Sequence, residues 1–363
     1  MQSQQDKKRI FIAALDWGLG HATRIIPIID FLEKSGIEVI IGASGACADL
    51  LRKEFPNKKI IRIPGYNIRY SRIPLFFKWS ILIRLPRIGW VMRKERLILD
   101  KIIEKYKIAA VISDNRPGLF SKKIPSVYIT HQLSIETGSS WMSKLATRWH
   151  QKMIQHFQTC WVPDLPEKGG LAGNLSHPKK LTGRSVVYIG PLSRMQPLPS
   201  SSRFDLLLLV SGPEPSRSIF EEKILEQVKG SRLKIALVRG LPGKSGIKIQ
   251  AEGLEVFHHL PAADLNRIIC DSDMILCRCG YSTVMDLNSL AKKAILVPTP
   301  GQTEQIYLAE HLRRSEIFYT VSEKKLNIKK DMKAAAGFNN QWLQNTNLHE
   351  SAIHQWLTEN QLI

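Results

Sequence analysis

The stretch that decides the fold runs from Cys277 to Gln305 and reads CRCGYSTVMDLNSLAKKAILVPTPGQTEQ. The apolar run 274–277 has the composition of a buried parallel strand, and Gly280 follows it where the chain has to turn into a helix. A second apolar run, 294–297, ends in Pro-Thr-Pro-Gly, and four polar residues follow. This order predicts strand, loop, helix, strand, loop and helix, which is the βαβ arrangement of a parallel sheet.

The first loop of this stretch contains the residues of a phosphate site. Ser282 or Thr283 is expected to cap the helix, whose backbone N–H groups and positive dipole end attract a phosphate. Asp286 lies about one helical turn further on, where its carboxylate can accept a hydrogen bond from a ribose hydroxyl. An ordinary βαβ unit with a capped helix is the alternative interpretation.

The stretch resembles the donor-binding signature of glycosyltransferase family 28, which is Arg-x-Gly-x-x-Thr-x-x-acidic-Leu, then Pro-x-Pro, then a Gln pair. Two departures concern acidic residues: Asp286 stands where Glu is usual, and Glu304 stands where the first Gln of the pair is usual. The second departure leaves the donor sugar open. The resemblance implies that the nucleotide diphosphate sugar is bound by Gly280, Tyr281, Ser282, Thr283, Asp286, Glu304 and Gln305. The other signature positions are Arg278, Leu287, Pro298 and Pro300.

The composition of the whole chain indicates a globular protein with an anionic partner. Its 363 residues are enough for two domains, and 52 Lys and Arg against 32 Asp and Glu give a net charge of +20. Nucleic acid, a phosphate-rich ligand and an acidic membrane surface all fit such a charge. Base-stacking or groove-reading motifs are not found, so a nucleic-acid partner is not expected.

Cysteine usage and hydropathy favour a cytoplasmic protein. The five cysteines are odd in number and lack CxxC spacing, so neither a disulfide framework nor a zinc site is predicted. The run 10–15 after Lys7-Lys8-Arg9 is too short for a signal peptide, and no run reaches the roughly 18 apolar residues of a membrane-spanning helix.

The N-terminal half of the chain has the pattern of a doubly wound parallel sheet. A strand at 10–15 leads into a turn with Gly18, Gly20 and His21, and a helix follows with apolar residues at helical spacing. Such a turn is where open α/β sheets bind ligands. Further expected strands are 39–41, 60–63, 109–113 and 127–130, and a helix is expected near 46–55.

Two polar residues that follow strands of this half are expected at the ligand-facing edge of the sheet. Asp114 follows the strand 109–113, and His131 follows the strand 127–130, so both are placed on the acceptor side. The segment Gly18-Leu19-Gly20-His21 also resembles the N-terminal Gly-rich loop of family 28, which implies that Gly18 and Gly20 contact the donor. With Ala22-Thr23-Arg24 added, it looks closer to a bacterial branch of the same superfamily.

The section from Arg69 to Lys107 interrupts the alternation of strands and helices. It contains eleven Lys or Arg and three acidic residues, interleaved with Phe76, Phe77, Trp79, Ile81, Leu82, Trp90 and Met92. This composition is expected of a surface that lies on anionic lipid. A partly buried helix pair with a solvated basic face is the alternative.

The stretch 164–199 is rich in Gly, Pro, Ser and Lys and predicts an interdomain linker that contains one short strand at 186–189. Near its end, Arg194 lies in a segment that resembles the family's Pro-x-x-Arg, which implies contact with the donor pyrophosphate.

A second βα series begins with a strand at 206–210, after which Ser211 and Gly212 stand where the family has a phosphate-binding Gly-Gly-Ser loop. Leu260 lies in a segment whose backbone contacts the uracil in the family. Adjacent His258 and His259 would point to opposite sides of an extended run, so a metal site is not expected.

The resemblance implies two Rossmann-like domains that face a central cleft, the GT-B architecture. Residues 1–192 form the expected acceptor-binding domain, and residues 193–344 form the expected donor-binding domain. One or two amphipathic helices are expected in the tail, which contains Trp342, Leu343, Ile353, Trp356 and Leu357. The last helix, within 345–363, is expected to pack back on the first domain.

The implied reaction is transfer of a sugar from a UDP-sugar to an acceptor, and the basic section favours a lipid-linked one at the inner face of the cell membrane. His21 is the candidate base, and Arg194 together with the helix after Gly280 would stabilise the departing diphosphate without a metal. A UDP-sugar hydrolase of the pseudaminic acid pathway type and a non-catalytic nucleotide-sugar-binding protein remain as alternatives. The oligomeric state stays open.

Overall fold

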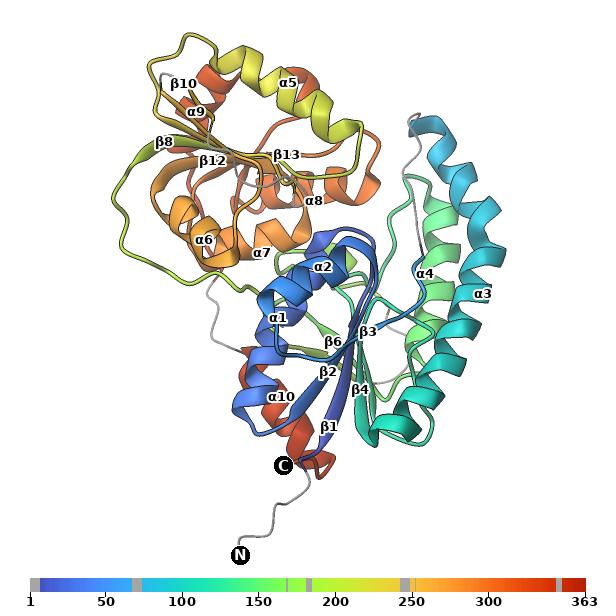
Figure 1. Cartoon of the computed structure of the whole chain (residues 1–363). Coiled ribbons are helices and arrows are strands. Elements are labelled where there is room, and N and C mark those ends of the chain that lie inside the picture. Colours follow the sequence, from blue (N-terminus) through green and yellow to red (C-terminus); the bar gives the residue numbers. More distant parts are fainter. Residues whose placement is uncertain are drawn as a thin grey trace, which may run out of the picture. The chain divides into compact units, whose positions relative to one another are not determined.

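The computed structural model describes residues 7–66, 74–167, 169–180, 185–241, 249–251, 253–343 and 348–363, with only the main chain described for 74–86 and 249–251. The chain divides into two compact units (Figure 1). Unit 1 comprises Met1–Leu192 and Asn345–Ile363, and unit 2 comprises Ser193–Gln344.

Unit 1 is built on a seven-stranded parallel sheet of order β3-β2-β1-β4-β5-β6-β7. Its central strands are continuous apolar runs with both faces buried, as the sequence predicts for a doubly wound sheet. The strands are β1 (Arg9–Ala14), β2 (Glu38–Ala43), β3 (Ile60–Arg62), β4 (Ile108–Asp114), β5 (Ser126–Ile129), β6 (Thr159–Val162) and β7 (Ser185–Tyr188). The chain moves outward from β1 in one direction through β2 and in the other through β4, so the sheet's switch point lies between β1 and β4.

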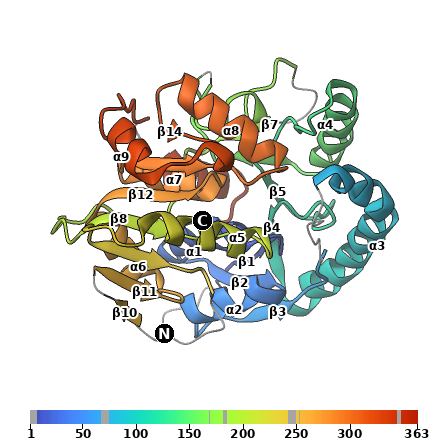
Figure 2. The ribbon, with the colours of Figure 1, turned by 90° about the horizontal axis from the view of Figure 1, so that it is seen from above.

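The helices of unit 1 are α1 (Leu19–Lys34), α2 (Gly45–Glu54), α3 (Pro74–Tyr106), α4 (Ser140–Ile154) and α10 (Leu348–Glu359), with a 3₁₀ turn at Gly173–Leu175. Figures 1 and 2 show α3 and α4 on the same side of this unit. Helix α3 is one continuous helix and not a helix pair. Val91, Glu95, Leu99 and Ile102 recur at helical spacing on its buried face.

The prediction that 164–199 is a linker is wrong for its first part. Strand β7 pairs with β6 and extends the sheet of unit 1. The buried carboxylate of Asp164 accepts hydrogen bonds from the backbone N–H of Leu165 at 2.8 Å, Leu171 at 2.7 Å and Ala172 at 3.0 Å. The Gly-rich composition therefore reflects a loop folded around one buried carboxylate, where a Cβ on Gly170 would lie 2.5 Å from Asp164.

The C-terminal tail contains a single described helix, α10, which packs on α1 of unit 1. Ile353, Trp356 and Leu357 form its buried face, and the ring of Trp356 meets Trp161 of β6 edge to face at 5.3 Å between centroids. Trp342 is not helical and instead contacts Phe318 in unit 2 at 5.1 Å.

Unit 2 repeats the topology with a second seven-stranded sheet of order β10-β11-β9-β8-β12-β13-β14. Its strands are parallel except for the pairing of β10 with β11. The strands are β8 (Phe204–Leu209), β9 (Ile235–Val238), β10 (Ile249–Ala251), β11 (Leu254–Phe257), β12 (Ser272–Arg278), β13 (Ala294–Val297) and β14 (Tyr319–Thr320). The switch point of this sheet lies between β8 and β12.

The helices of unit 2 are α5 (Ser216–Val228), α6 (Ala262–Cys270), α7 (Tyr281–Ser289), α8 (Thr303–Arg314) and α9 (Ile328–Ala336), with a 3₁₀ turn at Glu323–Lys325. The stretch quoted at the start therefore forms β12, α7, β13 and α8, and this order confirms the sequence prediction. The expected cap is wrong. Gly280 occupies the N-cap of α7, so Ser282 and Thr283 lie inside the first turn.

Candidate functional site

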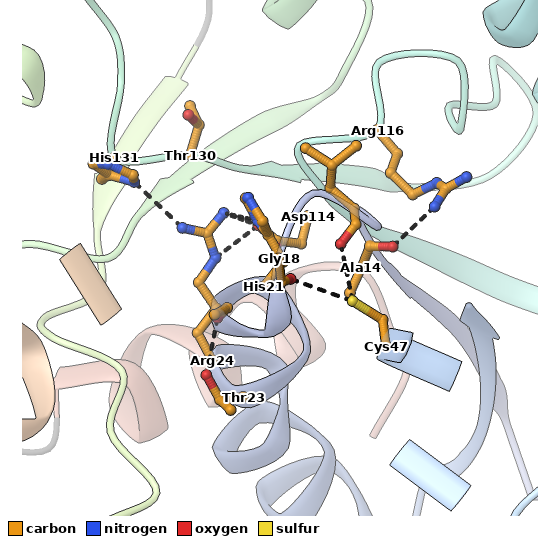
Figure 3. A network of polar contacts seen from close by, with 12 residues as sticks. Ala14, Gly18, His21, Thr23, Arg24, Cys47, Asp114, Arg116, Thr130 and His131 are labelled. Atoms are coloured by element: carbon orange, nitrogen blue, oxygen red, sulfur yellow. Dashed lines mark hydrogen bonds and ion pairs between the residues drawn. The ribbon is translucent and has the colours of Figure 1, made fainter. Parts of the chain in front are cut away.

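The switch point of unit 1 brings His21 and Asp114 together. Asp114 is the last residue of β4, and His21 lies in the first turn of α1, directly after the loop that leaves β1. Because β1 and β4 are neighbours, the two side chains meet although 93 positions separate them: His21 Nδ1 lies 2.9 Å from Asp114 Oδ2 (Figure 3). His21 is partly accessible, and Asp114 is fully buried.

Arg24 holds the other side of the same carboxylate. One helical turn after His21, its guanidinium donates to Asp114 Oδ1, through Nε at 2.8 Å and also through Nη2. Its Nη1 lies 3.3 Å from Nδ1 of His131, which follows β5 (Figure 3). Arg24, Asp114 and His131 are all buried, so this is a charge pair shielded from water, in which each charged group depends on its partner.

The charges of this cluster determine which ring nitrogen of His21 carries the proton. Burial works against ionising Asp114, but the charges of Arg24 and His21 and their hydrogen bonds outweigh it, and the pKa of Asp114 is lowered. The carboxylate can therefore only accept, so Nδ1 of His21 carries the hydrogen and its contact with Arg24 Nη2 is not a hydrogen bond. Burial lowers the pKa of His21, and the charge of Arg24 lowers it further, against the opposing charge and hydrogen bond of Asp114. The ring is therefore neutral near pH 7, with a lone pair on Nε2.

The loop before His21 is shaped by a glycine and a cysteine. Gly18, at the N-cap of α1, has φ +92°, a conformation that L side chains rarely adopt. Cys47 Sγ of α2 donates to Gly18 O at 3.3 Å, and Thr23 Oγ1 donates to Gly20 O at 3.0 Å. Burial raises the pKa of Cys47 to about 12, so it acts as a neutral donor that holds the loop.

Arg116, two residues after Asp114, is a structural residue. It is fully buried, with Nη1 donating to Ala14 O at 2.9 Å and Nε donating to Glu95 of α3 at 2.8 Å. Glu95 also accepts the hydroxyl of Tyr66 at 2.7 Å. These contacts tie the ends of β1 and β4 to α3 and so fix the place where His21 and Asp114 meet.

Unit 2 gathers the residues expected at the donor. Because β8, β11, β12 and β13 are parallel, the loops after them leave the same edge of the sheet. The loops after β8 and β12 flank the switch point: the first contains Ser211 and Gly212, the latter with φ +110°, and the second leads into α7. Leu260 lies in the loop after β11, and Glu304 and Gln305 lie in the first turn of α8, which follows the loop after β13.

The side chain of Asp286 in α7 lies close to Ser193 and Arg194, the first two residues of unit 2. Ser193 Oγ donates to Asp286 Oδ1 at 2.6 Å. Burial raises the pKa of Asp286 to about 6, against the opposing effects of the Ser193 hydrogen bond and the Arg194 charge. Ser193 is a partner that the sequence analysis missed, because nothing in the local pattern shows that the chain before β8 passes α7.

Two signature residues hold loops in place. Arg278 at the end of β12 is buried, with its guanidinium 3.8 Å above the Phe220 ring and Nη1 2.6 Å from Glu323. Gln305 Oε1 accepts the backbone N–H of Thr299 at 2.8 Å and so braces the loop after β13. His258 Nδ1 lies 3.2 Å from Arg239 Nη1, and the described part of the chain contains no cluster able to hold a metal ion.

Arg24 is the site residue that the sequence could have shown. It lies three positions after His21 in a helix, so both side chains project from one face toward the same carboxylate. The spacing of Arg24 from His21 is visible in the sequence, but the pairing of Arg24 with Asp114 is not.

Comparison with known proteins assigns this architecture. Residues 217–351 match the glycosyltransferase family 28 C-terminal domain. The UDP-N-acetylglucosamine--N-acetylmuramyl-(pentapeptide) pyrophosphoryl-undecaprenol N-acetylglucosamine transferase of Haemophilus ducreyi is 24% identical over 316 residues, which is 83% of this chain and 81% of the relative. An uncharacterized glycosyltransferase of Methanosarcina acetivorans is 23% identical over 320 residues, covering 82% and 81%.

Solved structures show the same fold. The glycosyltransferase of kitacinnamycin superposes with a TM-score of 0.62 at 10% identity, over 98% of this chain and 95% of the other. MurG of Acinetobacter baumannii superposes with a TM-score of 0.53 at 14% identity, over 97% and 99%. Two parallel-sheet domains, a family 28 domain in the C-terminal half and these relatives lead to one conclusion: the chain is a GT-B glycosyltransferase that resembles family 28.

Proposed function

We propose that this glycosyltransferase moves a sugar from a UDP-sugar to a hydroxyl group of a lipid-linked acceptor, with His21 as the general base. The observation that carries the proposal is the hydrogen-bonded pair of His21 and Asp114 at the switch point of unit 1. The relative from Haemophilus ducreyi, whose name specifies a UDP-sugar donor and a pyrophosphoryl-undecaprenol acceptor, supports this choice of substrates.

The proposed step uses the second nitrogen of the His21 ring. Nε2 accepts the proton of the acceptor hydroxyl while its oxygen forms a bond to the anomeric carbon of the donor sugar. The bond between that carbon and the phosphate oxygen breaks, and UDP leaves with the electron pair. Asp114, ionised and held by Arg24, stabilises the imidazolium that forms.

We assign the binding site of the leaving diphosphate to unit 2. The N-terminal end of α7, with Gly280 at its cap, presents backbone N–H groups and a positive dipole end. Arg194 supplies a full positive charge close to Asp286, and Asp286 accepts a ribose hydroxyl. Ser211, Gly212, Leu260, Glu304 and Gln305 line the same sheet edge and contact the rest of the donor. No metal is required by this scheme.

We propose that the protein meets its lipid-linked acceptor at a membrane surface. In the described part of α3, Trp90 and Leu97 are exposed, and Lys94 Nζ lies 3.9 Å from the centre of the Trp90 ring. Phe76, Phe77, Trp79, Ile81 and Leu82 lie outside the residues whose side chains are described. Over the part of the chain that the structure describes, no helix has the length and hydropathy needed to cross a bilayer. The exposed aromatic and basic side chains of α3 support our proposal that the protein is a peripheral enzyme on the cytoplasmic face of the membrane.

The product of the reaction tests the proposed function. Purified protein is incubated with a panel of UDP-sugars, with and without a membrane lipid extract, and the products are identified by mass spectrometry. A lipid that gains the mass of one sugar, with release of UDP, is the expected result. Free sugar formed at the same rate without lipid would instead identify a hydrolase in which His21 activates water, and UDP-sugar binding without turnover would identify a non-catalytic binding protein.

Donor affinity is expected to fall when Asp286 or Gln305 is replaced by Ala. Loss of a hydrogen bond to a charged group costs about 1.5 to 3 kcal/mol, so Asp286→Ala should weaken UDP binding by roughly ten- to hundredfold. Gln305→Ala should weaken it by less, because Gln305 also braces the Thr299 loop and is neutral. Isothermal titration with UDP measures both changes.

The pH dependence of UDP binding provides the control for Asp286. Since its pKa is about 6, the carboxylate is charged above that pH and loses its charge as the pH falls through it. Wild-type affinity should therefore decrease below pH about 6, and Asp286→Asn should remove this decrease. Unchanged affinity in both Ala variants would contradict the assignment of the donor site.

A further inference from the structure

His258 of unit 2 is a buried histidine that uses only one of its ring nitrogens. It follows β11 at the sheet edge where the donor is proposed to bind, and it is 8% exposed. Its Nδ1 lies 3.2 Å from Nη1 of Arg239, which follows the neighbouring strand β9. Within the described part of the chain, this contact is the only hydrogen bond of the ring.

The contact with Arg239 determines which nitrogen of the ring carries the hydrogen. A guanidinium group has donors only, so Nδ1 of His258 accepts and the hydrogen lies on Nε2. The ring therefore offers one N–H donor, at Nε2. A buried N–H group without an acceptor costs free energy, so a donor left in this state at the ligand edge indicates that a bound ligand supplies the oxygen.

Arg239 is itself held by a buried carboxylate. Its Nε donates to Glu221 of α5 at 2.7 Å, and the other oxygen of Glu221 accepts from Nη1 of Arg217. The same Nη1 of Arg217 donates to the backbone oxygen of Arg239 at 3.3 Å. Arg217 and Glu221 are both buried. These contacts fix the guanidinium of Arg239 and, through it, the orientation of the His258 ring.

The order of the strands determines on which side of the diphosphate the base of the donor lies. The sheet runs β11-β9-β8-β12-β13, and the diphosphate is assigned to the helix after β12. Glu304 and Gln305 begin the helix after β13, and their carboxylate and amide groups suit sugar hydroxyls. In a UDP-sugar the diphosphate lies between the sugar and the nucleoside. The nucleoside therefore extends to the other side, along the ends of β8, β9 and β11.

His258 lies at the far end of this path. Neighbouring strands are about 4.8 Å apart, so the end of β11 is about 14 Å from the end of β12. This distance is comparable with the reach from the diphosphate to the far edge of the base. The groups waiting there are donors, which match the carbonyl oxygens of a pyrimidine.

We propose that His258 selects the base of the donor by donating from Nε2 to O4 of uracil, and that Arg239 is the positioning residue that fixes the tautomer. O4 lies opposite the glycosidic nitrogen of the ring, on the edge farthest from the diphosphate. Cytosine has an NH₂ group at this position, so it would place a donor against the Nε2–H donor. The inference rests on the proposed function and deepens it, because it names the residues that distinguish uridine from cytidine nucleotides.

Isothermal titration of the full chain with UDP and CDP tests the role of His258. The two nucleotides share the ribose and the diphosphate and differ in the base alone. Wild type should bind UDP at least about tenfold more tightly than CDP. His258→Phe keeps a planar ring without the donor. It should weaken UDP binding by about three- to tenfold and leave CDP binding nearly unchanged, so that the two affinities become similar.

Variants of Arg239 test the positioning role. Arg239→Lys keeps a donor for Nδ1 and should keep the preference for UDP. Arg239→Met lets the hydrogen move to Nδ1, so that Nε2 can accept from cytosine, and the ratio of the two affinities should fall toward one. Glu221 keeps Arg217 as its partner in this variant, and circular dichroism checks the fold. Arg232→Met is the matched control, because Arg232 is exposed before the opposite end of β9, and it should bind both nucleotides like wild type.

Three outcomes would overturn the inference. These are wild type that binds CDP as tightly as UDP, His258→Phe that keeps the full preference for UDP, and Arg239→Met that weakens both nucleotides by the same factor. Asp286→Ala separates base selection from the donor site itself, since it should weaken UDP and CDP equally through their common ribose. If it does so while wild type shows no preference, the donor site stands and the role of His258 is wrong. Binding of neither nucleotide to wild type would refute both.

Discussion

Replacing His21 by Ala is expected to lower kcat by about 10²- to 10⁴-fold and to leave the affinity for UDP nearly unchanged. The ring sits at the switch point of unit 1 with Nδ1 bonded to Asp114, and its Nε2 is the nitrogen that accepts the proton in the proposed step. The residues assigned to the donor diphosphate belong to unit 2, so the variant removes the base without touching them. Release of UDP in the presence of acceptor measures kcat, and titration with UDP measures affinity.

His354→Ala is the matched control, because His354 is exposed on α10. It should turn over like wild type. The wild-type pH profile adds a second check: the neutral ring is the active form, so kcat/KM should fall as the pH decreases through the pKa of His21, which burial places below the ordinary value of 6.5. Turnover of His21→Ala within a fewfold of wild type would rule out the base.

Replacing Asp114 by Asn should reduce both turnover and stability. An amide oxygen that accepts from Arg24 leaves the amide NH₂ group facing His21 Nδ1, which favours the tautomer with the proton on Nε2. That tautomer cannot act as the base. Arg24 also keeps its buried charge without a carboxylate, and breaking a buried ion pair in this way costs about 3 to 5 kcal/mol. Urea unfolding and kcat measure the two losses.

A double variant separates the two effects of Asp114. With Arg24→Met added to Asp114→Asn, no buried charge remains unpaired, so much of the free energy of unfolding should return. Turnover should not return, because His21 still lacks its carboxylate. If Asp114→Asn alone unfolds at the same urea concentration as wild type, the buried ion pair does not stabilise unit 1 as described.

Lowering the pH should destabilise the wild-type protein, because the carboxylate of Asp114 becomes protonated. The pKa of Asp114 in the folded state is lower than its ordinary value of 3.8. Its contribution to stability is therefore fully present above about pH 3.8 and is lost as the pH falls through the folded-state pKa. Asp114→Asn lacks a group that titrates there, so its stability should change less over this range.

The elements that the sequence predicts well are those with local causes. The strands of both sheets are short apolar runs that end at polar or glycine residues, and the βαβ pattern from β12 to α8 follows from residues that are adjacent in the chain. His21 and Asp114 were each placed at the ligand edge from the same local pattern. Their hydrogen bond depends on β1 lying beside β4, a long-range pairing that the local sequence does not encode.

The errors have the same physical origin. Glycine, proline and serine are typical of linkers, but around Asp164 they allow a loop to bring backbone N–H groups to a buried carboxylate. A linker and a loop of this kind have the same composition, so composition alone does not distinguish them. Helix α4 is an element that the sequence analysis did not predict, and its Ser143 and Thr147 accept hydrogen bonds from the backbone of Thr137 and Ile135 in the loop before it.

The packing of α10 on unit 1 makes the N-terminal unit discontinuous in the sequence. Ile353, Trp356 and Leu357 complete a core whose other members precede residue 192, so the whole of unit 2 is translated between the two parts. Since synthesis proceeds from the N-terminus at about 5 to 20 residues per second, unit 2 can fold on the ribosome before unit 1 is complete. The surface that α10 covers on unit 1, around Trp161, stays exposed to solvent during that time.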